Sequence, residues 1–280
     1  MMTLSKIAEL ANVSVSTASK AFSGSKEVSQ ETRDHIFKVA KEYGCLKKFY
    51  KKDYYIPVIA VVCPELSGIY ARLVSYISTI LDKEKCKISI STTHHSVQKK
   101  RQLMEFHSRH SVAVGVIIID HEGSPELPHA SFFPADYQKA AEIAVKHLAD
   151  SGITDIAFVG WQQTEVEGNY NIIENKDAEI AAGKLMEKLP RAIICRDDLL
   201  AMGIIKKLTG KGVKIPEQLA VIGMGNEPAG EFMSPSLSTV DFKLKENARL
   251  AVKEILRQTD GEAPQEPEYL KPELIIRESI

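Results

Sequence analysis

The sequence predicts an N-terminal all-α helix-turn-helix head followed by an α/β core with parallel sheets. Three observations lead to this fold class. The first 44 residues hold short helical patterns joined by tight turns. From residue 57 onward, apolar runs typical of buried strands alternate with amphipathic helical patterns. Between these regions lies a basic, aromatic stretch with neither pattern. We therefore divide the chain into a head (1–44), a hinge or linker (45–56) and a core (57–280).

The first two helices of the head are predicted from apolar spacing and turn residues. Ile7, Leu10 and Ala11 recur at helical spacing and give the first helix one apolar face. Asn12 stands at the turn, where we expect the left-handed conformation that Asn tolerates. Ser14 is then expected to cap the second helix. The apolar side chains of that helix are expected to point inward: Val13, Ala18, Ala21 and Phe22.

The opposite face of the second helix carries mostly small polar side chains. These outward residues are Val15, Ser16, Thr17, Ser19 and Lys20. Such a face packs poorly against a protein core, whereas hydroxyl and ammonium groups suit hydrogen bonds to base edges and phosphates. The alternative is a generic three-helix bundle without a ligand, which leaves this face unexplained. The pattern therefore favours a helix that reads the major groove of double-stranded DNA.

A third helix completes the head. Ser29 is expected to be its N-cap, Glu31 complements the helix dipole in the first turn, and Gly44 is expected just past its C-terminus. The expected buried stripe consists of Ile36, Phe37, Ala40 and Tyr43.

Charge is distributed unevenly along the chain. Residues 1–52 carry ten Lys and Arg against five Asp and Glu, a net charge of +5, which leaves −6 for the rest of a chain whose net charge is −1. A basic head on an acidic body fits phosphate binding at one end only. The four cysteines are scattered without a CxxC pair and are expected to be reduced thiols. Without an 18-residue apolar run, we expect no membrane partner and a cytoplasmic location.

Motifs of other chemistries are weak. The pairs His94-His95 and His107-x-x-His110 lack a convincing third metal ligand, and Gly223-Met224-Gly225 lacks the third glycine of a dinucleotide fingerprint. The sequence contains no phosphate-binding Walker loop, GxSxG elbow or HExxH motif. We expect neither an enzyme nor a cofactor or metal site.

The core is predicted from its alternating elements. Strands are expected at 56–62, 88–91, 112–119, 156–159, 192–195, 219–224 and 273–277. Helices are expected at 71–81, 96–107, 140–149, 178–189, 199–208 and 244–256. In parallel sheets of this kind, ligands bind beyond the carboxyl ends of the strands.

The head carries the pattern T-L-x-x-I-A-x-L-A-x-V-S-x-S-T-x-S-x-x-x-x-G from Thr3 to Gly24, followed by Val28-Ser29-x-Glu31-Thr32-Arg33. It resembles the LacI/GalR (lactose-repressor/galactose-repressor) family of bacterial transcription regulators. Core segments 192–203, 220–224, 234–240 and 272–279 are similar to that family's regulatory core. The resemblance implies a two-lobed core like that of periplasmic binding proteins. It also implies a homodimeric repressor that binds a pseudo-palindromic operator. The location that it implies is bacterial and nucleoid-associated.

By this resemblance, the base-reading positions are Val15, Ser16 and Lys20. The positions near phosphates are Thr3, Ser5, Ser14, Thr17, Ser19 and Ser29. The family usually has Arg where this chain has Lys20. Lysine is a point charge rather than a bidentate fork, so weaker base discrimination is expected there.

The link between head and core departs from the family pattern. The family has a short hinge helix that inserts a Leu into the minor groove. Here residues 45–55 lack its Pro-Asn start but interleave basic and aromatic side chains, which suits phosphate contact and an intercalating wedge. Tyr54 is the expected wedge by position, with Phe49 and Tyr50 as the alternatives. A solvated linker is the other interpretation.

The core also departs from the pattern where an effector would bind. The resemblance places a small carbohydrate-like or metabolite effector against Tyr70, Thr92, Thr93, Asp198 and Asn226. However, the segment between Ile119 and Ala135 is shorter than in the family, which has another helix and strand there. The polar stretch 162–176 lacks the family's effector-binding Arg. Asn226 lies near the position where the family often has an acidic ligand-binding residue. Asp198 and Tyr70 also have structural interpretations, as a helix N-terminal carboxylate and a cleft-packing ring.

We therefore expect an atypical effector or none. The alternatives to a regulated repressor are a constitutive DNA-binding dimer with a degenerate core and a cytoplasmic solute-sensing module. With no heptad tail after the last strand, no coiled-coil tetramer is expected.

Overall fold

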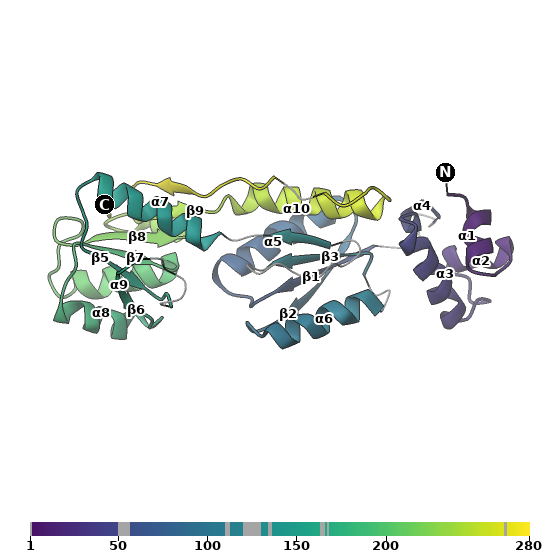
Figure 1. The fold of residues 1–280 in the computed structure, drawn as a ribbon, viewed down its shortest axis with the longest axis horizontal. Coiled ribbons are helices and arrows are strands. Elements are labelled where there is room, and N and C mark those ends of the chain that lie inside the picture. Colours follow the sequence, from purple (N-terminus) through teal and green to yellow (C-terminus); the bar gives the residue numbers. More distant parts are fainter. Residues whose placement is uncertain are drawn as a thin grey trace. The chain divides into compact units, whose positions relative to one another are not determined.

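The structure is a computed structural model, and it describes residues 2–49, 57–109, 113–119, 130–133, 136–162, 166, 168–265 and 268–280 (Figure 1). The chain divides into two compact units. Unit 1 comprises residues 1–134 and 245–269, and unit 2 comprises residues 135–244 and 270–280. The chain therefore passes from one unit to the other three times.

The head of unit 1 contains helices α1 (Leu4–Leu10), α2 (Val15–Phe22), α3 (Gln30–Glu42) and α4 (Leu46–Phe49). Asn12 at the first turn has a φ of 52° and Gly44 after α3 has a φ of 60°, so both predicted left-handed positions are confirmed. The predicted N-caps Ser14 and Ser29 are confirmed as well.

The head has an apolar centre in which α1, α2 and α3 meet. Its fully buried side chains are Ile7, Ala18, Ala21, Phe22, Ile36 and Ala40. Two predicted core residues differ: Leu10 is 37% exposed and Tyr43 is 50% exposed, whereas Val39 is buried. Both exposed residues lie at or next to the last turn of their helices, where fewer neighbouring helices cover them.

The sheet of unit 1 is entirely parallel in the order β2-β1-β3-β4. Its strands are β1 (Val58–Cys63), β2 (Lys87–Thr92), β3 (Gly115–Ile119) and β4 (Ala130–Phe133). Helix α6 (Val97–Arg109) packs on one face, where Met104 joins a cluster with Val62 and Ile118. The other face carries α5 (Gly68–Lys83) and α10 (Leu244–Thr259), since Ile255 lies against Gly115 (Figure 1).

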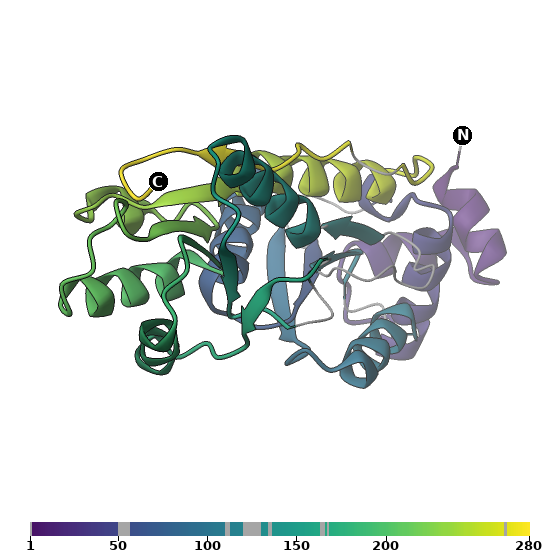
Figure 2. The ribbon, with the colours of Figure 1, turned by 60° about the vertical axis from the view of Figure 1, so that its left-hand side comes forward.

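The sheet of unit 2 has the order β10-β9-β8-β7-β5-β6, in which only β10 is antiparallel to its neighbour. The strands are β5 (Ile156–Val159), β6 (Asn171–Ile173), β7 (Ala192–Cys195), β8 (Ala220–Met224), β9 (Ser238–Asp241) and β10 (Glu273–Ile275). Helices α8 (Ala178–Glu187) and α9 (Asp198–Thr209) share one apolar cluster with β5, β7 and β8. Helix α7 (Tyr137–Asp150) covers the opposite face (Figures 1 and 2).

The predicted fold class is confirmed, and the missed elements are short. Strands β4, β6 and β9 span three or four residues each, and the short 3₁₀ helix at Pro228–Phe232 spans five. Strands β5 and β7 are as short but were predicted because each is a continuous apolar run, whereas β4, β6 and β9 each contain polar residues. β4 and β6 are also edge strands, which need a continuous apolar run less than central strands do.

Candidate nucleic-acid interface and effector site

Helix α2 separates an apolar face from a solvent-facing one, as the sequence predicts. Ala18, Ala21 and Phe22 are fully buried. Val15 is 47% exposed, and Ser16 and Ser19 are exposed. A half-exposed Val beside two hydroxyls offers a groove both an apolar contact and hydrogen-bonding groups.

Three of the predicted phosphate-contacting hydroxyls are also helix caps. The side-chain oxygens of Thr3, Ser14 and Ser29 accept hydrogen bonds from the backbone N–H three residues on, at 3.3, 2.9 and 3.2 Å. A capping oxygen uses a lone pair, so its own O–H remains a donor that can point outward. Ser5 and Ser19 also lie exposed on α1 and α2.

Two of the caps extend to a second hydroxyl. The Ser14 hydroxyl lies 2.8 Å from that of Thr17, and the Ser29 hydroxyl lies 2.8 Å from that of Thr32. The predicted phosphate residue Thr17 is therefore engaged with the cap of its own helix.

Lys20 has a partner that the sequence motif does not reveal. Its ammonium lies 2.5 Å from the carboxylate of Glu27, seven residues along the chain. The carboxylate comes from the turn between α2 and α3. A seven-residue separation across a turn has no periodic signature, so only the folded head shows this pair.

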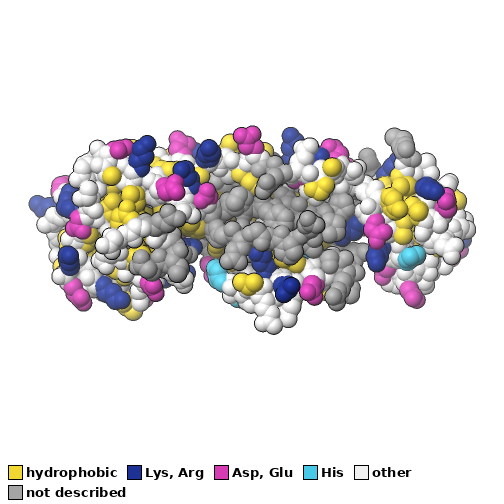
Figure 3. Space-filling view, in the orientation of Figure 1, with side chains coloured by type: hydrophobic (Ala, Val, Ile, Leu, Met, Phe, Trp, Pro, Cys, Tyr) yellow, Lys and Arg dark blue, Asp and Glu magenta, His cyan; other side chains and the backbone are white. Residues whose placement is uncertain are grey.

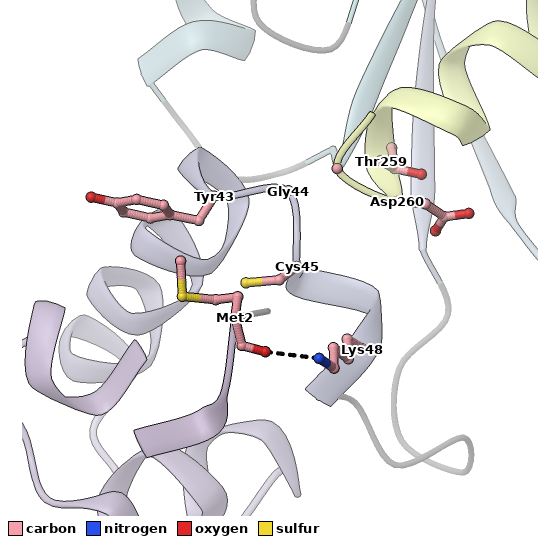
Figure 4. A pocket seen from close by; sticks show the side chains of 8 residues that line it. Met2, Tyr43, Gly44, Cys45, Lys48, Thr259 and Asp260 are labelled. Atoms are coloured by element: carbon pink, nitrogen blue, oxygen red, sulfur yellow. Dashed lines mark hydrogen bonds between the residues drawn. The ribbon is translucent and has the colours of Figure 1, made fainter. Parts of the chain in front are cut away.

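The described part of the hinge packs on the head. In α4, the ring of Phe49 lies 5.6 Å from that of Phe22, and Leu46 is buried. Lys48 lies over the Phe49 ring and its Nζ donates to the Met2 carbonyl at 2.8 Å (Figure 4). Phe49 is thus used in packing the head. The wedge candidates Tyr50 and Tyr54 lie outside the described residues.

An open hollow of about 450 Å³ lies beside α4 in unit 1 (Figure 4). Its lining residues are Met2, Tyr43, Gly44, Cys45, Lys48, Thr259, Asp260 and Gly261. Gly44 and Gly261 meet backbone to backbone, and a Cβ on either would collide with the other. Beside this contact, Lys41 Nζ donates to the Ala113 carbonyl at 2.7 Å, and burial lowers the pKa of Lys41. The head is thereby joined to the turn after α10 and to the start of β3.

The candidate effector residues of unit 1 gather at the carboxyl ends of β1 and β2. Tyr70 in the first turn of α5 is buried, and its ring makes an edge contact with His95. The Thr92 hydroxyl lies 3.1 Å from Nε2 of His94. Thr93 is buried, and its N–H donates to the Cys63 carbonyl at 2.9 Å. These residues form one polar cluster at the edge where parallel sheets bind ligands.

Asp198 of unit 2 is held by its own neighbours. It opens α9 and is 2% exposed. Its Oδ1 accepts from the Thr239 hydroxyl and its Oδ2 accepts from the Glu227 N–H, both at 2.6 Å. A Cβ at Gly223 would collide with Oδ1, so this glycine makes room for the carboxylate. These contacts favour the structural interpretation of Asp198.

Asn226 lies in the same polar network after β8. Its amide N–H donates to Asp241 at 3.3 Å, and its Oδ1 accepts from the Arg277 guanidinium at 2.9 Å. The same guanidinium donates to the Leu237 carbonyl at 2.6 Å. Arg277 thus ties the C-terminal segment to β9 and fixes the Asn226 amide.

An aromatic cluster around Arg196 was not predicted from the sequence. Its guanidinium lies 4.3 Å from the ring centroid of Tyr137 and 5.0 Å from that of Trp161. Trp161 is fully buried and contacts Phe158 edge to face. Arg196 and Trp161 follow the carboxyl ends of β7 and β5. The chain therefore places its own cation over two aromatic rings at the ligand-binding edge of this sheet.

Comparisons with known proteins agree with both parts of the chain. Residues 3–45 match the model for bacterial regulatory proteins of the lacI family, and residues 163–280 match a periplasmic binding protein-like domain. The transcriptional repressor PurR of Vibrio campbellii is 24% identical, with 100% of this chain and 99% of PurR covered. The regulator NtdR of the NTD biosynthesis operon in Bacillus subtilis is 26% identical, with both chains covered in full.

Residues 3–45 thus form a DNA-binding domain of the lacI family. The chain is a DNA-binding transcriptional repressor of the LacI type, and its relatives are transcription regulators rather than enzymes. Solved structures show the same fold. A transcriptional regulator CelR in complex with cellobiose has a TM-score of 0.64 at 19% identity, with both chains covered in full. A LacI family regulator from Arthrobacter in complex with lactose has a TM-score of 0.65 at 24% identity, covering 80% of this chain and 99% of that one.

This chain is shorter than those relatives. The alignments with PurR and NtdR run over 337 and 329 positions, whereas the chain has 280 residues. Because both relatives are covered over 99% or more of their length, they contain segments that this chain lacks. This agrees with the predicted shortening of the core.

Two features are absent from the part of the chain that the structure describes. No helix there is long and apolar enough to span a membrane. No group of three or more His, Cys, Asp or Glu side chains there is arranged to hold a metal ion. Of the histidines singled out in the sequence, His110 lies outside the described residues.

Proposed function

We propose that the chain binds a pseudo-palindromic operator as a homodimer, with Val15, Ser16 and Lys20 reading base edges in the major groove. The observation that supports this best is the solvent-facing side of α2. Its base-reading candidates project from a helix whose other face is fully buried and whose N-terminus is capped by Ser14. A helix held this rigidly can present side chains to a groove with a fixed register.

Phosphate contacts are assigned to the hydroxyls around this helix. They are Thr3, Ser5, Ser14, Thr17, Ser19 and Ser29. Three of them lie at the N-termini of α1, α2 and α3, where the helix dipole and backbone N–H groups favour an anion. The +5 charge of residues 1–52 adds attraction that does not depend on sequence.

Dimerisation is assigned to the core. Unit 2 exposes several large apolar side chains, and Figure 3 shows apolar areas surrounded by interspersed acidic and basic groups. The exposed apolar residues of unit 2 are Ile180, Met186, Leu199, Phe232, Leu270 and Ile276. A two-fold dimer would bring two heads to two half-sites of the operator.

Control by a small carbohydrate-like or metabolite effector is the finer part of the proposal, with Tyr70, Thr92 and Thr93 as its polar contacts in unit 1. The alternative is a constitutive DNA-binding dimer. It is favoured by unit 2, where Asp198 and Asn226 bond to neighbouring residues and Arg196 lies over two aromatic rings. The structures with cellobiose and lactose concern other members of the fold. They suggest which ligands to test first.

The test is selection of duplexes from a random-sequence pool by the full-length chain, followed by affinity measurements on the enriched sequence. We expect a pseudo-palindromic site that Lys20→Ala binds more weakly, and a dimer by light scattering. No enriched sequence would contradict the proposal. Cellobiose and lactose are then added to the preformed complex. Release of DNA supports effector control, and unchanged binding supports the constitutive alternative.

A further inference from the structure

The Lys20–Glu27 pair lies on the surface that we assign to base reading. The ammonium and the carboxylate are 2.5 Å apart, with 45% and 69% of the two side chains exposed. Lys20 lies in the last turn of α2, and Glu27 lies in the turn that leads to α3. An exposed ion pair contributes little to folding stability. The pair is therefore of interest for its position on the base-reading surface and not for its contribution to folding stability.

The turn that carries Glu27 is tied to the helices on both sides. The Arg33 guanidinium of α3 donates to the Ser25 carbonyl at 2.7 Å and to the Val28 carbonyl at 3.4 Å. The Ser25 N–H donates to the Lys20 carbonyl at 3.0 Å, and Val28 is buried. Glu27 thus projects from a backbone fixed on either side of it, and its carboxylate is held beside Lys20.

This geometry limits what Lys20 can contact. Any group that accepts a hydrogen bond from the Lys20 ammonium also comes close to the Glu27 carboxylate. A phosphate is negatively charged and offers only acceptors, so the carboxylate repels it. A base pair can satisfy both side chains, because its major-groove edge presents acceptors and a donor next to each other.

We propose that Lys20 and Glu27 together read one G·C base pair in each half-site. Lys20 donates to O6 or N7 of guanine, and Glu27 accepts from the N4 amino group of cytosine. These are the pairings that the two side chains favour in major grooves. The proposal deepens the proposed function and rests on it. Glu27 is then a specificity-determining residue. The family usually has Arg in place of Lys20, and Arg can contact a base through two N–H groups. Here the Glu27 carboxylate supplies the second contact that the Lys20 ammonium lacks.

The experiment uses the full-length chain and a random duplex pool, with Glu27→Gln as the test variant. Glu9→Gln is the matched control, because Glu9 pairs with Lys6 at 2.7 Å and the two side chains are 67% and 50% exposed. We expect the wild type and Glu9→Gln to enrich the same G·C pair in each half-site. Glu27→Gln should tolerate other pairs at that position alone, with discrimination reduced about tenfold.

A change in the DNA tests the same contact from the other side. The cytosine of that pair is replaced by N4-methylcytosine. Its methyl group takes the place of the amino hydrogen that faces the major groove. The methyl group should weaken wild-type binding and have a smaller effect on Glu27→Gln. Melting temperatures of both variants are measured as well, and both should match the wild type because the two glutamates are exposed.

The outcomes separate this proposal from the proposed function. If the wild type enriches a site but Glu27→Gln enriches the identical site with equal discrimination, the reading by Glu27 is overturned and the DNA-binding function stands. An A·T pair at the position that responds to Lys20→Ala and Glu27→Gln also overturns the G·C assignment. If the wild type enriches no site, the proposed function itself fails.

Discussion

Asp198 and Thr239 are joined by a hydrogen bond of 2.6 Å, donated by the threonine hydroxyl of β9 to Oδ1 of the aspartate that opens α9. The Glu227 N–H donates to Oδ2 at 2.6 Å. A carboxylate at a helix N-terminus also interacts favourably with the helix dipole. Together these contacts explain how a charged group can be 2% exposed in unit 2.

Replacing Asp198 by Asn should destabilise unit 2. One carboxylate oxygen becomes an amide NH₂ that faces the Thr239 hydroxyl or the Glu227 N–H, so a buried hydrogen bond to a charged group is lost. We expect the free energy of unfolding to fall by about 2–3 kcal/mol. Urea denaturation followed by circular dichroism measures the change.

Asp197→Asn is the matched control. Asp197 caps α9 by accepting from the Leu200 N–H at 2.8 Å, and Asn caps a helix about as well as Asp. Its unfolding free energy should stay within about 0.5 kcal/mol of the wild type. If Asp198→Asn is equally harmless, the hydrogen bonds of Asp198 do not stabilise the fold, and its ligand-binding interpretation gains support.

Arg196→Ala should loosen the aromatic cluster of unit 2. The guanidinium stacks on Tyr137 and Trp161, and a desolvated cation–π contact contributes roughly 1–2 kcal/mol. Trp161 is the only tryptophan of the sequence, so its fluorescence reports on this cluster directly. We expect a shift of the native emission to longer wavelength and a lower unfolding midpoint in urea.

Arg191→Ala provides the comparison. Its guanidinium donates to the Glu217 carbonyl at 2.8 Å on an exposed part of unit 2. We expect unchanged Trp161 emission and a small change in stability for this variant. Equal fluorescence of the wild type and Arg196→Ala would show that the stacking does not order Trp161.

The head could be predicted almost completely from the sequence because its determinants are local. Capping hydroxyls, the left-handed Asn12 and the helical spacing of apolar residues each act within a few residues. In the core, the apolar runs revealed the central strands and the parallel arrangement. The edge strands β4 and β6 were missed because each contains a polar residue, unlike the short but continuously apolar β5 and β7.

The candidate sites were harder to predict because they depend on contacts between distant segments. Glu27 meets Lys20 across a turn, and Asp198 meets Thr239 across 41 residues. Arg196 contacts the rings of Tyr137 and Trp161 only when β5, β7 and α7 assemble. The family resemblance suggested Asp198 as a ligand-binding group, but its two hydrogen-bond donors can be recognised only in the folded unit.

Ser29→Asp should separate the capping role of this hydroxyl from its assigned role at a phosphate. Aspartate caps helices about as well as serine, so the melting temperature should be close to that of the wild type. The added negative charge would repel a phosphate next to the N-terminus of α3. We expect DNA affinity to fall about tenfold, with a salt dependence that is shallower by about one unit of slope.

Gln30→Glu adds the same charge one residue further along. Gln30 is exposed and its amide donates to Asp34 at 2.8 Å within α3. We assign no DNA contact to it, so its effect measures the general influence of an extra negative charge on the head. Equal losses of affinity in the two variants would argue against a phosphate at the Ser29 cap.

His107 should make the stability of unit 1 depend on pH. Its side chain in α6 is 5% exposed, and neither ring nitrogen has a hydrogen-bond partner among the described residues. Burial, and then the charge of Lys41, lowers the His107 pKa below its usual value of 6.5. In the unfolded chain the imidazole binds a proton as the pH falls through about 6.5, whereas the folded protein keeps it neutral to lower pH. Stability is therefore complete above pH 6.5 and declines below it until the folded pKa is reached.

His107→Leu removes this titration. The difference in unfolding free energy between wild type and variant should change between pH 7.5 and 5.5, with a slope of at most about 1.4 kcal/mol per pH unit. A wild-type minus His107→Leu difference that stays constant over this range would show that His107 titrates alike in the folded and unfolded states. Protonating the buried imidazole beside Lys41 would then not lower the free energy of unfolding.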